Sequence, residues 1–169
     1  LTQKVIGFPQ GHFYESVVKD QTERHSSVNP IASPKWALEH TRERNMSAEM
    51  QEIVLASRPD AAPTAENFRL ESAELPQPGE GEVLVKVHYM SLDPYMRGRM
   101  DDAKSYAAPV PIGGRMEAGG VGEVIASNSP YFEVGDFAFG MFGWASHGCL
   151  PAKELRKLDP KQGPITAAL

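Results

Sequence analysis

Residues 82–89 read EVLVKVHY, the run in which apolar and polar side chains alternate most clearly. A period of two is typical of a β-strand with one half-buried face. The side chains expected on that face are Val83, Val85, Val87 and Tyr89. Residues 76–81, PQPGEG, predict a turn before this strand, and residues 68–71 are expected to form the strand that enters the turn.

Short apolar runs separated by turn residues continue on both sides of this pair of strands. The further runs expected to form strands are residues 52–56, 122–126, 136–141 and 144–150. Regularly spaced short strands with frequent glycine and proline are typical of a β-barrel or a β-sandwich. The sequence therefore predicts a mainly β fold.

Composition disfavours several classes of protein. With 169 residues, 41% of them hydrophobic, the chain can bury one core of ordinary size. Its net charge of -5 disfavours nucleic-acid or membrane partners, because both attract clustered positive charge. The single cysteine, Cys149, cannot form an internal disulfide and fits a reducing compartment. No run reaches the roughly 18 apolar residues of a membrane span and no export pattern is seen, so we expect a cytoplasmic protein.

Two unequal parts follow one another along the chain. Residues 1–45 show neither a helical nor a strand period, and we expect them to be a disordered tail or a non-native extension. The alternative is an arm that docks on a partner through its aromatic residues, Phe8, Phe13, Tyr14 and Trp36. Residues 46–169 are expected to form the folded domain, because Met46 and Met50 stand just before its first strand.

Residues 91–100, SLDPYMRGRM, predict a short helix after the strand. Proline fits the first helical position, and the Asp93 carboxylate could accept the free amides of the first turn. On such a helix Tyr95 and Arg99 share one side, and Met96 and Met100 share the adjoining side. One interpretation is purely structural: the helix closes the end of a barrel, with both methionines in the core and both arginines in water.

The other interpretation of this segment is a functional site. A tyrosine phenol is a neutral donor with a pKa of about 10, and it can stabilise the negative charge that builds on a carbonyl oxygen during nucleophilic attack. Arg97 or Arg99 could add a fixed positive charge, and Tyr106, in a following loop, could offer a second hydroxyl. Sequence period alone leaves both interpretations open.

Competing kinds of site are disfavoured by residue spacing. From Gly120 onward the dinucleotide-binding glycine pattern fails, because Ile125 occupies the position of the third glycine and the sequence that follows is strand-like. His88 and His147 have no partners at the spacing of a tetrahedral zinc site, so no metal site is expected. Cys149 is interpreted as a structural thiol.

Several segments match a known family, namely residues 54–59, 66–70, 78–84, 91–100 and 135–136. Together they resemble the zinc-free branch of the medium-chain dehydrogenase/reductase superfamily, which contains the leukotriene/prostaglandin reductases and bacterial curcumin reductase. The resemblance covers roughly residues 50–169. It implies a GroES-like, partly open β-barrel with short helices, normally followed by a Rossmann domain that holds NADPH. No sequence of that second domain is recognised, so the Rossmann domain is expected to be absent.

The resemblance also implies an activity. Members of this family pass a hydride from NADPH to the β-carbon of a small, apolar, α,β-unsaturated ketone or aldehyde, without zinc. By this resemblance Tyr95 is the catalytic residue that polarises the substrate carbonyl, and Tyr106 assists it. The residues expected to contact the substrate are Asp93, Met96, Arg97 and Trp144.

Three functions remain open on the sequence. The first is the N-terminal domain of an NADPH-dependent alkene reductase, inactive in isolation because NADPH is bound mainly by the Rossmann domain, with a homodimer expected for the full-length enzyme. The second is a non-catalytic, truncated barrel that binds a ligand or partner. The third is a quinone reductase of the same superfamily.

Overall fold

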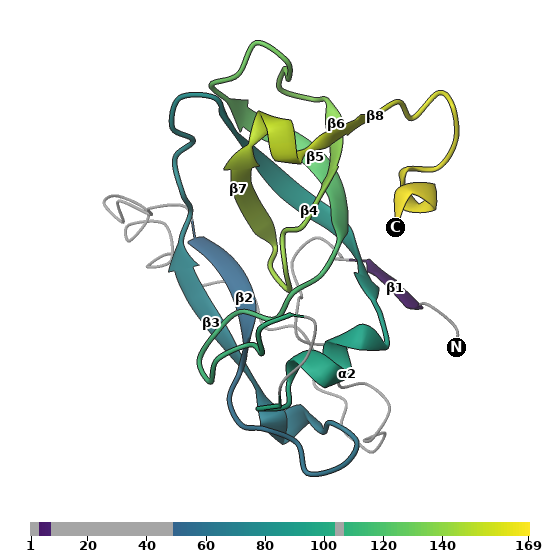
Figure 1. The fold of residues 1–169 in the computed structure, drawn as a ribbon. Helices are drawn as coiled ribbons and strands as arrows, with labels where there is room; N and C mark the ends of the chain where they lie inside the picture. The colour runs from purple at the N-terminus through teal and green to yellow at the C-terminus, as the bar shows by residue number, and fades with distance from the viewer. Residues whose placement is uncertain (1–3, 8–48, 104–106) are drawn as a thin grey trace, which may run out of the picture.

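The computed structural model describes residues 4–7, 49–103 and 107–169. These residues form antiparallel strands with a few short helices between them (Figure 1), so the prediction of a mainly β fold is confirmed. The helical elements are α2 (Tyr95–Arg99) and the 3-10 turns η2 (Ala65–Asn67), η3 (Ala152–Glu154) and η4 (Ile165–Ala168).

A six-stranded antiparallel sheet is the main element of the fold. Its strands are β1 (Lys4–Gly7), β4 (Glu82–Leu92), β5 (Gly120–Ser127), β6 (Phe137–Gly140), β7 (His147–Pro151) and β8 (Arg156–Leu158). They run in the order β1-β4-β5-β6-β8, and β7 pairs with the first half of β4. The long strand β4 therefore touches three neighbours, and it leads directly into α2 (Figure 1).

A separate two-stranded sheet consists of β2 (Glu49–Leu55) and β3 (Phe68–Glu74). Two isolated bridges, Glu52 with Ala145 and Val54 with Arg115, join it to segments that flank the larger sheet. The two sheets do not merge into one closed ladder, so the barrel is partly open.

Two apolar clusters fill the interior. The first lies among β4, β5, β6 and the residues around β7, and contains Val83, Val85, Val87, Val124, Phe132, Ala138, Phe142 and Ala152. The second lies beside α2 and contains Leu55, Met90, Met96, Met100, Val110, Met116 and Ala118. Each cluster contains side chains with no exposure to solvent, as expected for an apolar core.

One of the four side chains expected on the buried face of β4 was assigned wrongly. Val83, Val85 and Val87 are buried, as predicted, but Tyr89 is 37% exposed and Met90 is buried in its place. The register between β4 and β5 shifts between Val87 and Tyr89, and such an irregularity exchanges the faces of the residues that follow.

The N-terminal segment contributes one described element. Lys4–Gly7 form β1, which pairs antiparallel with Tyr89–Leu92 at the end of β4. The rest of residues 1–45, including the aromatic residues of the alternative docking arm, lies outside the described residues. The domain boundary at residue 46 stays a prediction.

Candidate functional site

The candidate site begins where β4 turns into α2. The Met96 amide donates to the Asp93 carbonyl (3.1 Å), and Pro94 already has helical dihedral angles, φ -58 and ψ -29. The carboxylate of Asp93 does not cap the helix as predicted, since no side-chain cap bond is present there. It accepts a hydrogen bond from the hydroxyl of Ser91 (2.7 Å). Ser91 is buried, and a buried hydroxyl needs such a partner.

Helix α2 presents two different faces to its surroundings. Met96 and Met100 are each 3% exposed and belong to the second cluster, which confirms the expectation that both lie in the core. Tyr95 is half-buried and packs against the edge of that cluster, as do Leu92 and Trp144. Tyr95 and Trp144, 49 positions apart in the sequence, thus pack against the same cluster.

Trp144 carries an unusual feature at this edge. Its ring packs against that of Phe68, with centroids 5.1 Å apart and planes tilted by 34°. Its indole Nε1 is buried, yet no acceptor for it is found in the described part of the chain. A buried donor without a partner costs about 1–3 kcal/mol, so an acceptor arriving with a ligand would remove that cost.

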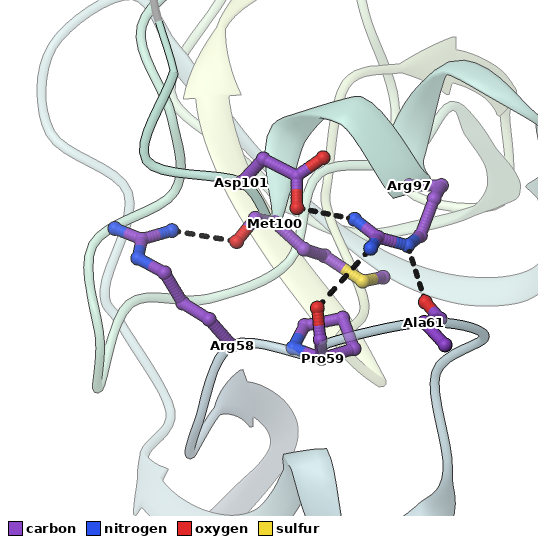
Figure 2. Close-up of polar contacts among 6 residues, drawn as sticks. All are labelled: Arg58, Pro59, Ala61, Arg97, Met100 and Asp101. Carbon is purple, nitrogen blue, oxygen red and sulfur yellow. Dashed lines mark hydrogen bonds and ion pairs between the residues drawn. The ribbon is translucent and has the colours of Figure 1, made fainter.

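Both arginines of α2 bind protein groups, in contrast to the purely structural interpretation of this segment, which placed them in water. Arg97 donates from Nε to the Ala61 carbonyl (2.9 Å), from Nη2 to the Pro59 carbonyl (3.1 Å) and from Nη1 to the Asp101 carboxylate (2.5 Å). Arg58 donates in the opposite direction, to the Met100 carbonyl (2.7 Å). Figure 2 shows these contacts between α2 and the segment after β2.

Arg99 is also engaged. Its side chain is only 11% exposed and forms a two-pronged ion pair with the Glu117 carboxylate, in which Nε lies 2.8 Å from Oε2. Paired in this way, Arg99 helps to fix the far end of α2. The other predicted tyrosine, Tyr106, lies outside the described residues, and its part in the site stays a prediction.

The segment around the helix also contains residues that sequence reasoning missed. Neither Arg58 nor Glu117 was predicted, although both contact α2. Asp101 follows Arg97 by four positions, the spacing of a helical ion pair, and that spacing was the one available signal. Substrate contacts of Asp93, Met96, Arg97 and Trp144 stay predictions.

The glycines of residues 119–122 serve strand packing. Gly120 and Gly122 lie in β5, and a Cβ on Gly122 would be only 2.0 Å from the Lys86 carbonyl oxygen of β4. Because the run is part of a strand, its amides do not converge at a helix N-terminus as a phosphate site requires. These glycines therefore do not form a phosphate site.

Two side chains of β7, His147 and Cys149, have shifted pKa values. Burial, together with the nearby charge of Glu82 and a hydrogen bond to it, raises the pKa of Cys149 to about 11. This fits the structural thiol expected from the sequence. Burial and then the charge of Lys86 lower the pKa of His147 below its usual 6.5. Its Nδ1 lies 3.0 Å from the Ser146 hydroxyl.

Three further observations concern possible metal binding, membrane spans and hollows among the described residues. Within residues 4–7, 49–103 and 107–169, no group of His, Cys, Asp and Glu side chains is gathered as a metal site would need. None of the helices formed by these residues is long and apolar enough to cross a bilayer. A hollow of about 840 Å³ is lined by residues 80–81, 129–132 and parts of 151–157, and it includes no residue of α2.

Comparison with known proteins gives one family. The family model described as the N-terminal domain of an oxidoreductase matches residues 51–158. The NADPH-dependent curcumin reductase of Escherichia coli (strain K12) is 51% identical over 112 residues, covering 66% of this chain and 32% of that protein. Prostaglandin reductase 1 of Rattus norvegicus is 34% identical over 110 residues, covering 63% of this chain and 31% of that protein.

Solved structures give the same result. CurA from Vibrio vulnificus in complex with NADPH shares 50% identity and a TM-score of 0.60, over 63% of this chain and 32% of that one. The chain thus spans about a third of the length of the relatives it matches.

Proposed function

Because the chain belongs to the zinc-free branch of the medium-chain dehydrogenase/reductase superfamily, that of the curcumin and prostaglandin reductases, we propose that it is the GroES-like substrate-side domain of an NADPH-dependent reductase. The proposed substrates are small, apolar α,β-unsaturated ketones and aldehydes, reduced at the carbon–carbon double bond. The names of the curcumin, prostaglandin and 2-alkenal reductases support this class of substrate.

The observation that carries the proposal is the position of the Tyr95 phenol. It stands on the first turn of α2, half-buried at the edge of an apolar cluster. A neutral phenol held there can donate to a carbonyl oxygen and stabilise the enolate charge that develops on it. The apolar surroundings strengthen this interaction, because the effective dielectric constant is lower than in water.

The other site residues have supporting roles in this proposal. Trp144 forms a wall of the substrate site, and its indole Nε1, for which the described residues offer no acceptor, can donate to an oxygen of the substrate. We further propose that Tyr106 assists Tyr95. Asp93 holds the turn through Ser91, and Met96 supplies apolar surface beneath it.

NADPH, when bound by the whole enzyme, supplies the hydride. The glycines of β5 do not fit its phosphates, so we propose that other parts of the enzyme hold it and that these residues bind and orient the substrate. On its own the 169-residue chain should then bind NADPH weakly and should not consume it. Titration of the isolated chain with NADPH checks this, and micromolar affinity would contradict it.

A domain exchange tests the activity. Residues 51–158 replace the matching N-terminal part of the Escherichia coli curcumin reductase, and NADPH consumption is measured with an aromatic conjugated enone. We expect turnover, and we expect Tyr95→Phe to lower kcat by about a hundredfold to a thousandfold through loss of one donor to the oxyanion.

Tyr89→Phe is the matched control, because it removes the same hydroxyl from a partly exposed tyrosine outside α2. If both variants reduce the enone at the rate of the unchanged hybrid, Tyr95 does not polarise the substrate. If no enone is reduced by a folded hybrid, the substrate class is wrong.

A further inference from the structure

Helix α2 is too short to hold its own position. It has five residues, includes Gly98, and has no side-chain cap at its N-terminus. An isolated helix of this length is unstable in water, because nucleation costs more than one turn of hydrogen bonds returns. The orientation of Tyr95, its first residue, must therefore come from contacts with other parts of the fold.

Apolar packing supplies only part of that orientation. Met96 and Met100 lie in the second cluster and anchor one side of the helix. Methionine side chains are unbranched and adapt to many shapes, so two such anchors allow the helix to rock about the line that joins them. Directional contacts on other sides of the helix stop this motion, and the ion pair of Arg99 with Glu117 is one of them.

Arg97 on α2 and Arg58 in the segment of residues 58–61 provide a second set of directional contacts. Arg97 reaches from the helix to the Pro59 and Ala61 carbonyls, while Arg58 reaches back to the Met100 carbonyl (Figure 2). The two sets of bonds run in opposite directions, so the segment and the helix cannot slide past one another without breaking one of them.

Each arginine acts at a different place on the helix. Met100 is the C-cap, and a guanidinium at that end is also favoured by the helix dipole. The Arg97 guanidinium donates to three acceptors, including the Asp101 carboxylate. With a side chain 33% exposed, Arg97 is partly shielded from water, which keeps these bonds effective.

We propose that Arg58 and Arg97 are positioning residues that fix α2 and thereby the direction of the Tyr95 phenol. This inference rests on the proposed function, in which that phenol meets the substrate carbonyl. Arg97 then contributes to substrate recognition by holding the helix that carries the donor, with two of its own N–H groups bound to backbone carbonyls and a third to the Asp101 carboxylate. A displacement of about 1 Å at such a donor is enough to lower its effect strongly.

Substitution by lysine should have different effects at Arg58 and at Arg97. The hydrogen bond found for the Arg58 side chain among the described residues goes to the Met100 carbonyl, and a lysine ammonium can also donate to that carbonyl. Arg97 makes three bonds from a planar fork, and a single ammonium cannot replace their geometry. Arg58→Lys should therefore keep the clamp, whereas Arg97→Lys should lose most of it.

Hydrogen–deuterium exchange of the 169-residue chain tests the clamp independently of any substrate. The amides to follow are those of Met96, Arg97 and Met100, which donate within the turn. In the Arg97→Ala and Arg97→Lys proteins these amides should exchange with deuterium about tenfold faster. A tenfold change in exchange rate corresponds to about 1.4 kcal/mol in the free energy of opening. Arg58→Lys should leave them unchanged.

Arg69→Ala is the matched control, because Arg69 is an exposed arginine paired with Glu71 on β3, away from α2. Urea unfolding of each variant separates loosening of α2 from loss of the fold. Unchanged exchange at α2 in a folded Arg97→Ala protein would overturn the clamp.

A double-mutant cycle then connects the clamp to Tyr95. Binding of 4-phenyl-3-buten-2-one, an aromatic conjugated enone, to the 169-residue chain is followed by NMR for wild type, R97A, Y95F and the double variant. R97A should weaken binding about fivefold to tenfold in the wild type and have no further effect in the Y95F background. A purely structural role of Arg97 would give the same loss in both backgrounds.

The outcomes separate the two proposals. If Y95F leaves enone binding unchanged, the proposed role of the phenol fails, while the exchange experiment still decides whether the clamp holds α2. If Y95F weakens binding and R97A does not, the phenol contributes and the positioning role of Arg97 is wrong.

Discussion

Strands β4 and β5 approach each other closely at Gly122, and this close approach gives a test of the fold. Gly122 pairs with Val87 in the register of these strands. An ideal Cβ at Gly122 would lie 2.0 Å from the Lys86 carbonyl oxygen, 2.7 Å from the Lys86 carbonyl carbon and 2.8 Å from the Val87 Cα. All three atoms belong to the backbone, so no side-chain rotation can relieve the overlap in Gly122→Ala.

The size of the effect follows from that distance. Real Cβ contacts are essentially never below 3.0 Å, so β4 would have to retreat from β5 by about 1 Å. Such a shift breaks ladder hydrogen bonds and opens the first cluster, and we expect a loss of about 3 kcal/mol in the free energy of unfolding. With a urea dependence of about 1–3 kcal/mol/M, the unfolding midpoint should fall by about 1–3 M.

Gly98→Ala is the control, since it is the same chemical change at a helical glycine with nothing within 4 Å of the added atom. It should raise stability by about 0.5–1 kcal/mol. Urea unfolding followed by circular dichroism measures both variants. A Gly122→Ala protein whose free energy of unfolding lies within about 1 kcal/mol of wild type would refute the close approach of β4 and β5.

Three further predictions concern two partly buried side chains, Cys149 and His147, and one buried side chain, Met96. Because the Cys149 pKa is about 11 instead of 9.0, its thiolate fraction at neutral pH is about a hundredfold lower than that of a free thiol. Alkylation of Cys149 by iodoacetamide should therefore be about a hundredfold slower than alkylation of a free thiol, and it should be faster in Glu82→Gln. Mass spectrometry measures the labelling, and rapid labelling of Cys149 would contradict the prediction. His147 has a lowered pKa, so as pH falls below about 6.5 the unfolded state takes up a proton that the folded state does not, and stability falls. His147→Gln should reduce this fall of the urea midpoint below about pH 6.5, and parallel curves for the two proteins would contradict it. Met96→Ala should cost about 2–5 kcal/mol in thermal or urea unfolding, since Met96 is 3% exposed, and a loss below about 1 kcal/mol would place it outside the core.

Much of the strand content could be predicted because alternation is a local property of the sequence. The expected strands at residues 52–56, 68–71, 82–89 and 122–126 all fall on observed strands, with ends that differ by a few residues. The error at Tyr89 has a long-range cause. The bulge that turns this side chain outward arises from the pairing of β4 with β5, and no period within β4 encodes it.

The candidate site could be predicted only in part. The spacing of Met96 and Met100 correctly indicated a buried side of α2, because that spacing is set by the helix itself. The clamp was missed because its acceptors are the backbone carbonyls of Pro59, Ala61 and Met100. Every residue has such a carbonyl, so the sequence carries no sign of which ones an arginine will reach.

The composition of the two clusters explains why a polar clamp is needed beside one of them. The first cluster is dominated by valines on paired strands, whose branched side chains have few rotamers and define one arrangement. In the second cluster, four of the seven buried residues of the described chain are methionines. Methionine fills space without fixing direction, so this cluster can hold α2 in place but cannot orient it. Hydrogen bonds are directional, and the arginines therefore supply the property that the methionines lack.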